Sequence, residues 1–233
     1  MKIAQMGNEH TNSSSRKGHV PFVIVNHISS STMSSMDNWF RSSGNEVSSA
    51  HFGVSKDGRV HQYVDIKLAA WANGLKAAAI PNAPSIVVKE MKVNPNLYTI
   101  SIEHEGTDGN LTEAQFTASV WLHGHIQAEV KRIWGKIIKL DARHVIGHCH
   151  IDPIRKASCP GPRFPWDRLY QVLKGEEEML EKVKVDVNGK KVGEGLLVNG
   201  ITYVPVRVVG EALGAVVDWN EKNKTVKLTP REG

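Results

Sequence analysis

The run 147–162 constrains this chain more than any other part of it, because it gathers histidine, cysteine, proline and glycine. Proline and glycine interrupt helices and strands, so we expect a rigid loop that folds His148 and Cys159 toward one point. Imidazole and thiolate are both good zinc ligands. The run therefore predicts a zinc site, with His150 as an alternative ligand and a Cys149–Cys159 disulfide as an alternative state of the thiols.

We expect a third zinc ligand from His27. The preceding run 21–26 is apolar on both alternating faces, which predicts a central strand covered on both sides. The end of such a strand is a fixed position, which suits a ligand. Three protein ligands leave one tetrahedral position open for a water, which zinc turns into a nucleophile.

A hydrolase also needs a proton acceptor, and Glu103 is the candidate. The alternation of its strand predicts that Tyr98, Ile100 and Ile102 point one way and Glu103 the other. A carboxylate beside a zinc site can carry a proton from water to a leaving amine. Lys156 could stabilise the oxyanion that develops on the attacked carbonyl.

Helical and strand patterns alternate through the first part of the chain, which predicts an α/β domain: a central mixed sheet flanked by helices. A long helix is expected to begin at Thr112, in a capping box with Gln115, and to end at Gly135. We also expect a shorter helix at 34–42 and two strands at 51–55 and 59–64, which a turn at Lys56–Gly58 joins.

The composition changes after about residue 175, since the eleven histidines and both cysteines all precede residue 160. We expect a catalytic domain at 1–174, a linker at 175–182 and a small β-rich α+β module at 183–233. In that module Asn188-Gly189 and Asn199-Gly200 predict hairpins. The expected strands and helix are 183–187, 190–192, 196–198, 201–204, 206–213 (the helix), 215–219 and 225–229.

The net charge of +5 comes from the first part: residues 1–174 hold 20 Lys and Arg against 14 Asp and Glu, and the remainder holds 9 against 10. A mildly basic domain suits a polyanion such as a Gram-positive wall. We expect no nucleic-acid partner, no membrane span and a monomer. The N-terminus lacks the apolar segment of a secretory signal, so we expect synthesis in the bacterial cytoplasm.

Several separated motifs occur in an order that resembles the zinc-dependent N-acetylmuramoyl-L-alanine amidases, a family that includes phage lysins and is akin to peptidoglycan-recognition proteins. The resemblance covers roughly residues 18–173. Its motifs are 24–27, 49–54, 57–60, 98–103, 147–148 and 155–162.

This resemblance implies zinc on His27, His148 and Cys159, and Glu103 as the catalytic acid/base. It also implies that Lys156 supports the transition state and that His51 and Trp71 line the substrate cleft. The loop between the second and third ligands is one residue longer than in many relatives, which keeps His150 open as an alternative to His148.

Residues 183–229 resemble the small module first described at the N-terminus of copper amine oxidases, which recurs in Gram-positive surface proteins. Because this region has no histidine or cysteine, we expect cell-wall binding and not copper binding. The resulting hypothesis is a phage endolysin that cleaves peptidoglycan between N-acetylmuramic acid and L-alanine after release through a holin pore. The alternatives are a prophage or host autolysin, a non-catalytic peptidoglycan-recognition protein and a zinc peptidase that cuts within the stem peptide.

Overall fold

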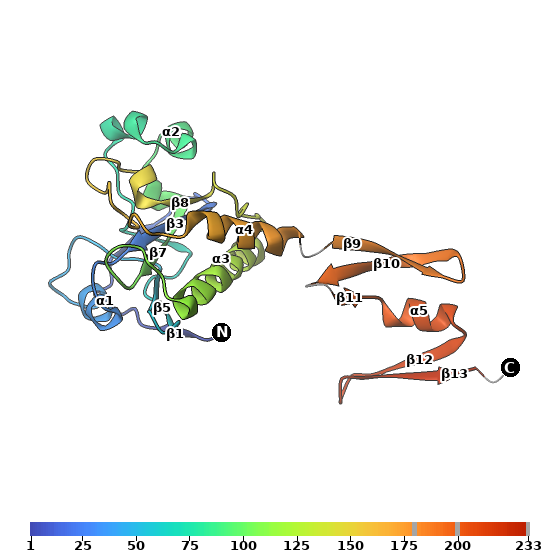
Figure 1. Cartoon of the computed structure of the whole chain (residues 1–233). Coiled ribbons are helices and arrows are strands. Elements are labelled where there is room, and N and C mark those ends of the chain that lie inside the picture. The colour runs from blue at the N-terminus through green and yellow to red at the C-terminus, as the bar shows by residue number, and fades with distance from the viewer. Residues whose placement is uncertain (179–180, 199–200, 232–233) are drawn as a thin grey trace. The chain divides into compact units, whose positions relative to one another are not determined.

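A six-stranded mixed sheet forms the centre of the larger unit in the computed structural model, which describes residues 1–178, 181–198 and 201–231 (Figure 1). Strands β3, β4, β7 and β8 are parallel, whereas β5 runs antiparallel to β4 and carries β1 beside it. The predicted central mixed sheet is therefore confirmed. The strand order is β1 (Ile3–Gln5), β5 (Val60–Gln62), β4 (Phe52–Val54), β7 (Thr99–His104), β3 (Val23–Ile28) and β8 (Val145–Gly147).

Helices cover both faces of this sheet. On one face, α3 (Glu113–Trp134) and α4 (Trp166–Glu178) pack against a cluster that includes Ile24 of β3. On the other face, η1 (Ala77–Asn82) and α2 (Ile86–Met91) pack against Val23 and Val25 of the same strand. The predicted central strand is thus covered on both sides, as its apolar alternation required. A third cluster places α1 (Met33–Phe40) against Ala50 and Tyr63.

The long helix α3 begins and ends where the sequence predicts. Thr112 Oγ1 accepts a hydrogen bond from the Gln115 backbone N–H (3.1 Å), and Gly135 ends the helix with a φ of +67°. The predicted capping box is only half formed. The Gln115 amide donates instead to the carbonyl oxygens of Val54 and Glu105, at 3.0 Å each. These two bonds tie the start of the helix to the central sheet.

The predicted alternation in β7 is correct from Thr99 onward but wrong for Tyr98. Tyr98 lies at the end of the 3₁₀ turn η2 (Pro95–Leu97), with φ −122° and ψ +7°, so its backbone is not yet extended. Its ring therefore packs in the cluster of Val23 and Val25, on the face opposite Ile100. Glu103 does lie on the face away from Ile100, as expected.

The predicted hairpin between β4 and β5 is present, with antiparallel pairing and the Lys56–Gly58 turn. Several short elements were not predicted, because three to six residues carry too little periodicity to be recognised. They include strands β2 (Ser13–Ser15) and β6 (Leu68–Ala70), which pair with each other, and the 3₁₀ turn η3 (His148–His150). The run 147–162 is consequently not loop throughout.

A smaller second unit spans Lys174–Gly233. Strands β9 (Glu181–Val187) and β10 (Lys190–Val198) form the first predicted hairpin around Asn188-Gly189. The two strands predicted at 190–192 and 196–198 are one strand with a register shift between Lys191 and Gly193. The Asn199-Gly200 turn lies outside the described residues. Within the predicted linker at 175–182, residues 175–178 belong to helix α4, residues 181–182 belong to strand β9, and residues 179–180 lie outside the described residues. The remaining elements are β11 (Ile201–Tyr203), α5 (Val206–Ala212), β12 (Ala215–Asn220) and β13 (Thr225–Pro230).

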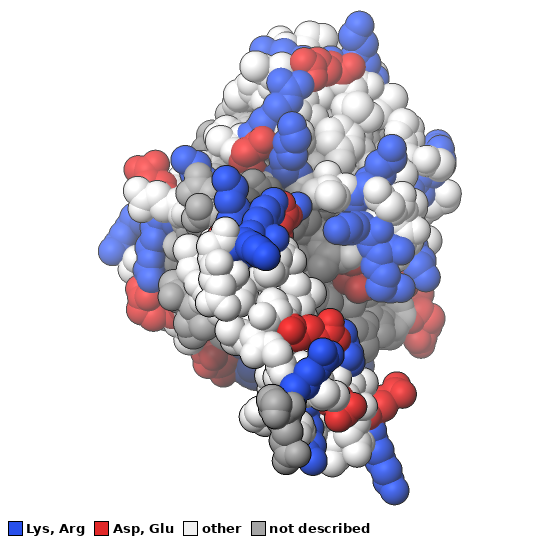
Figure 2. All heavy atoms as spheres, turned by 90° about the vertical axis from the view of Figure 1, so that its right-hand side faces the viewer, with Lys and Arg blue, Asp and Glu red and all other residues white. Residues whose placement is uncertain are grey.

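Charge is mixed over the face of the molecule seen in Figure 2, where Asp and Glu side chains lie among those of Lys and Arg. The net charge of +5 is therefore not gathered into one basic stripe on this face. None of the described helices is both long and apolar enough to cross a membrane.

Candidate metal centre and cleft

The site lies where three parallel strands end. His27 is near the end of β3 and is paired in register with Glu103 of β7. His148 follows directly after β8, the other neighbour of β3. The carboxyl ends of parallel strands meet at one edge of a sheet, where α/β proteins bind ligands. The sheet topology thus brings together side chains that are more than a hundred residues apart.

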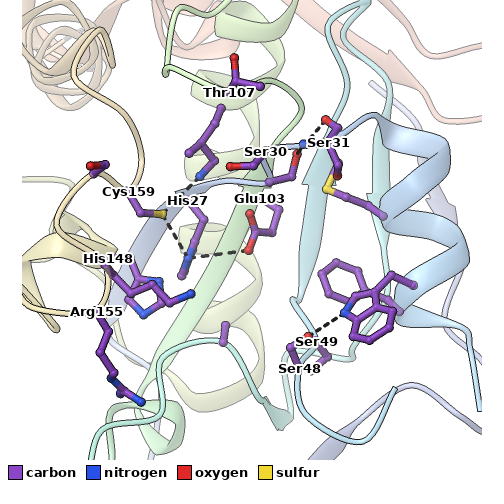
Figure 3. A pocket seen from close by; sticks show the side chains of 18 of the residues that line it. His27, Ser30, Ser31, Ser48, Ser49, Glu103, Thr107, His148, Arg155 and Cys159 are labelled. Atoms are coloured by element: carbon purple, nitrogen blue, oxygen red, sulfur yellow. Dashed lines mark hydrogen bonds and ion pairs between the residues drawn. The ribbon is translucent and has the colours of Figure 1, made fainter. Parts of the chain in front are cut away.

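Figure 3 shows the His27 ring at the centre of this group. His27 Nδ1 lies 3.9 Å from the Cys159 sulfur and 3.7 Å from Oε1 of Glu103. The ring centroids of His27 and His148 are 4.5 Å apart. The potential ligand atoms of His27, His148 and Cys159 all lie within 4.8 Å of one another.

Two hydrogen bonds donated by backbone N–H groups hold Cys159 beside the sheet, at the end of the loop that follows β8. The Cys149 N–H donates to the Cys159 carbonyl oxygen (2.9 Å), and the Ile28 N–H donates to the Cys159 sulfur (3.4 Å). Arg155 pairs with Asp152 and also donates to the Gly74 carbonyl oxygen (3.1 Å), which anchors the middle of the loop. Both cysteines are free thiols, so the alternative disulfide is wrong.

The same loop separates the roles of its two histidines. His150 turns away from the group, and its Nδ1 accepts a hydrogen bond from the Gly147 N–H (3.1 Å). Its ring lies beside Trp166, with centroids 5.9 Å apart. Among the described residues, His148 and not His150 therefore joins His27 and Cys159.

The three donors suit a zinc ion. Tetrahedral zinc with one nitrogen at about 2.1 Å and one sulfur at about 2.3 Å places these two atoms roughly 3.6 Å apart. The 3.9 Å between His27 Nδ1 and Cys159 Sγ is close to that separation. In addition, Oε2 of Glu103 is buried and has no hydrogen-bond partner in the described part of the chain, as expected beside a site that receives a polar ligand.

The surroundings of the three donors shift their pKa values in different directions. Burial, together with nearby positive charge, lowers the pKa of His27 well below its ordinary range and that of His148 to about 4, so both rings are neutral at pH 7 with lone pairs available. Burial and the Glu103 carboxylate raise the pKa of the Cys159 thiol to about 12. A bound cation would reverse that shift, because a coordinating thiol loses its proton.

Glu103 is suited to proton transfer near neutral pH. Its side chain is only 16% exposed, and burial raises its pKa to about 7, against a smaller lowering by Lys156. A group with a pKa near the working pH can both accept and release a proton. Lys156 itself is exposed and lines the cleft beside the metal group.

Of the two residues expected in the substrate cleft, the structure places Trp71 at the cleft and His51 in the interior. Trp71 lines the cleft and is 37% exposed. His51 is 1% exposed and does not line the cleft. Its Nε2 accepts a hydrogen bond from the buried Arg16 guanidinium (2.8 Å), and its Nδ1 lies 3.0 Å from Ser101 Oγ. His51 therefore connects buried segments of the interior and does not face the cleft.

The cleft also contains residues that were not predicted. Trp39 of α1 is 46% exposed at its rim, and its indole N–H donates to Ser48 Oγ (2.9 Å). The run Ser29–Ser31, directly after β3, forms part of its floor near His27. The sequence signal for these serines is their position, which begins two residues after the predicted ligand His27.

Comparison with known proteins identifies the domain. Residues 16–162, which contain every member of the metal group and Glu103, match the N-acetylmuramoyl-L-alanine amidase family. The chain belongs to this family. Residues 182–232 match a second family, described as the copper amine oxidase N-terminal domain. Both resemblances expected from the sequence are confirmed.

Curated relatives include 1,6-anhydro-N-acetylmuramyl-L-alanine amidases named AmpD. The Escherichia coli protein is 32% identical over 130 residues, which cover 55% of this chain and 60% of the relative. The Haemophilus influenzae protein is 28% identical over 127 residues, covering 54% and 59%. The chain thus spans about 60% of the length of the curated relatives it matches.

Solved structures are similar in fold to this chain. A selenomethionine AmpD structure has a TM-score of 0.53 and 23% identity, covering 73% of this chain and 93% of that one. The amidase LysC from Clostridium intestinale has a TM-score of 0.51 and 18% identity, covering 75% and 98%. At these identities the likeness concerns the fold alone.

Proposed function

We propose that this chain is an N-acetylmuramoyl-L-alanine amidase that hydrolyses the amide between N-acetylmuramic acid and the L-alanine of the stem peptide in peptidoglycan. The observation that carries the proposal is the pair formed by the buried His27 and the half-buried Glu103. These side chains lie 3.7 Å apart at the ends of neighbouring strands, with Cys159 and His148 around the same ring. The family match over residues 16–162 supports the reaction type.

His27, His148 and Cys159 would hold one zinc ion per chain. When bound, zinc supplies a Lewis acid that polarises an amide carbonyl and lowers the pKa of water. The neutral imidazoles contribute two lone pairs, and the Cys159 thiolate neutralises part of the dication. The loop anchored by Arg155 and Asp152 keeps the sulfur beside the sheet.

Glu103 is the catalytic acid/base in this proposal. Its carboxylate takes a proton from the attacking water and returns it to the amide nitrogen that leaves, which its pKa of about 7 favours in both directions. Lys156 places a positive charge in the same cleft, where it stabilises negative charge developing on the carbonyl oxygen. Trp71 offers an exposed aromatic surface to the substrate.

We further propose that the substrate is the assembled wall of a Gram-positive bacterium and that the chain acts as a monomeric phage endolysin, made in the host cytoplasm and released through a holin pore. The second module, at residues 182–232, would provide the attachment to the wall. The fold shared with a Clostridium intestinale endolysin is consistent with this role.

The AmpD relatives favour a second candidate substrate. Their name specifies 1,6-anhydro-N-acetylmuramyl-L-alanine, which is a soluble fragment and not an assembled wall. The two candidates separate when the full chain is given insoluble Gram-positive wall and a soluble anhydro-muropeptide at equal amide concentration. Faster release from the wall supports the endolysin role, and faster cleavage of the fragment supports the AmpD-like role.

The reaction itself is tested by the appearance of new L-alanine N-termini in purified peptidoglycan, with and without a zinc chelator. We expect release by the wild type, loss on chelation and recovery when zinc is returned. Binding without release would indicate a recognition protein. New N-termini at other stem residues would indicate a zinc peptidase, and release that persists after zinc removal would refute the proposed centre.

A further inference from the structure

The two nitrogens of the His27 ring have different surroundings. Nδ1 faces the metal group, at 3.9 Å from the Cys159 sulfur and 3.7 Å from the Glu103 carboxylate. Nε2, on the far side of the ring, is buried and makes no hydrogen bond to any of the described residues. A metal-binding histidine usually donates its second N–H to an oxygen, which fixes the tautomer and the ring orientation. The surroundings of Nε2 therefore decide how well this ligand is held.

Asn73 presents an oxygen to that side of the ring. It follows strand β6 and is 1% exposed. Its backbone N–H donates to Asn96 Oδ1 (2.6 Å), and its side-chain Nδ2 donates to Thr99 Oγ1 (2.9 Å). The Thr99 hydroxyl in turn donates to the Pro95 carbonyl oxygen (2.7 Å). With its nitrogen committed in this way, the carboxamide has one possible orientation.

In this orientation Oδ1 of Asn73 is buried and has no hydrogen-bond partner among the described residues, as is also true of Nε2 of His27. The Asn73 side chain lies within hydrogen-bonding reach of the His27 ring. Within the described part of the chain, the Asn73 oxygen that can accept and the His27 ring nitrogen that can donate therefore both lack another partner.

We propose that Asn73 is a positioning residue whose side-chain oxygen accepts the Nε2–H of His27 and so directs the Nδ1 lone pair at the metal. The inference rests on the proposed zinc centre and adds to it a residue outside the cleft, since Ala72 lines the cleft and Asn73 does not. Asn73 acts through His27 alone and touches no substrate.

The test measures zinc affinity of the full chain by competition with a chromophoric chelator. Asn73→Leu removes the acceptor while keeping a similar volume, and we expect it to weaken zinc binding about 10- to 100-fold. Asn73→Asp restores an acceptor and should stay within about threefold of the wild type. The matched control is Asn45→Leu. Asn45 is also buried, 2% exposed, but its bonds to Trp39 and Ser48 lie away from the metal group.

A second measurement does not depend on the leucine variant folding. In the zinc-loaded wild type, ¹⁵N NMR should show His27 protonated at Nε2 and metal-bound at Nδ1. A proton on Nδ1 would overturn the inference, as would an Asn73→Leu protein that binds zinc as tightly as the wild type or an Asn45→Leu protein that is weakened as much. A wild type that binds no zinc would overturn the metal centre itself, which is a distinguishable result.

Discussion

Replacing Glu103 by glutamine should nearly abolish amide hydrolysis while leaving the metal group intact. The glutamine keeps the size of the side chain and one carbonyl oxygen, so it fills the same place beside His27. It cannot bind or release a proton near pH 7. Glu103 is not one of the three clustered donors, so zinc content should remain at one ion per chain.

The size of the effect follows from the environment of the carboxylate. Burial raises its pKa to about 7, which places it where a proton relay is most effective at neutral pH. A positioned acid/base of this kind contributes about 10²- to 10⁴-fold to the rate. Its loss therefore corresponds to roughly 3 to 5 kcal/mol of transition-state stabilisation.

The assay compares kcat/KM for release of L-alanine N-termini with zinc content in the same preparations. The matched control is Glu105→Gln, two residues further along, whose carboxylate accepts a hydrogen bond from the Lys56 N–H outside the metal group. The control should retain activity within about threefold. Retention of more than a tenth of the activity in Glu103→Gln, or a loss explained by missing zinc, would refute the proton-relay role.

Three further predictions concern the metal, the fold and the module. Cys159→Ser should lower zinc affinity more than about tenfold, whereas Cys149→Ser should not, because only Cys159 joins the donor group; equilibrium dialysis decides between them. His123 is fully buried, and burial lowers its pKa from 6.5 to about 4. The unfolded chain therefore binds the His123 proton first, and this residue alone should lower the free energy of unfolding by about 3 kcal/mol as the pH drops from 6.5 to 4. Urea titrations at several pH values give the free energy of unfolding as a function of pH. Its decrease between pH 6.5 and 4 should be smaller in His123→Gln than in the wild type, and an equal decrease would contradict this. Trp219 is 51% exposed on β12, and Trp219→Ala should weaken co-sedimentation with Gram-positive walls about fivefold, through loss of roughly 1 kcal/mol of stacking, without changing cleavage of soluble fragments; equal binding by the variant would exclude this residue from wall attachment.

Much of the site could be predicted from the sequence because its residues end strongly patterned segments. The apolar run before His27 predicted a covered central strand, and the alternation around Glu103 predicted which face its carboxylate takes. The cap at Thr112 and the glycine at 135 likewise predicted both ends of α3. Each of these depends on interactions among residues close in sequence, so periodicity and capping chemistry are sufficient.

Other features were decided only by packing. The sequence left His148 and His150 as alternatives, and the choice depends on the path of the loop that Arg155 and Asp152 anchor. His51 was expected in the cleft, but Arg16 reaches it from another segment and holds it in the interior. Local pattern fixes the face of a strand on which a side chain lies. Which distant side chain meets it there depends on the order and register of the strands, and these emerge only when the whole sheet is assembled.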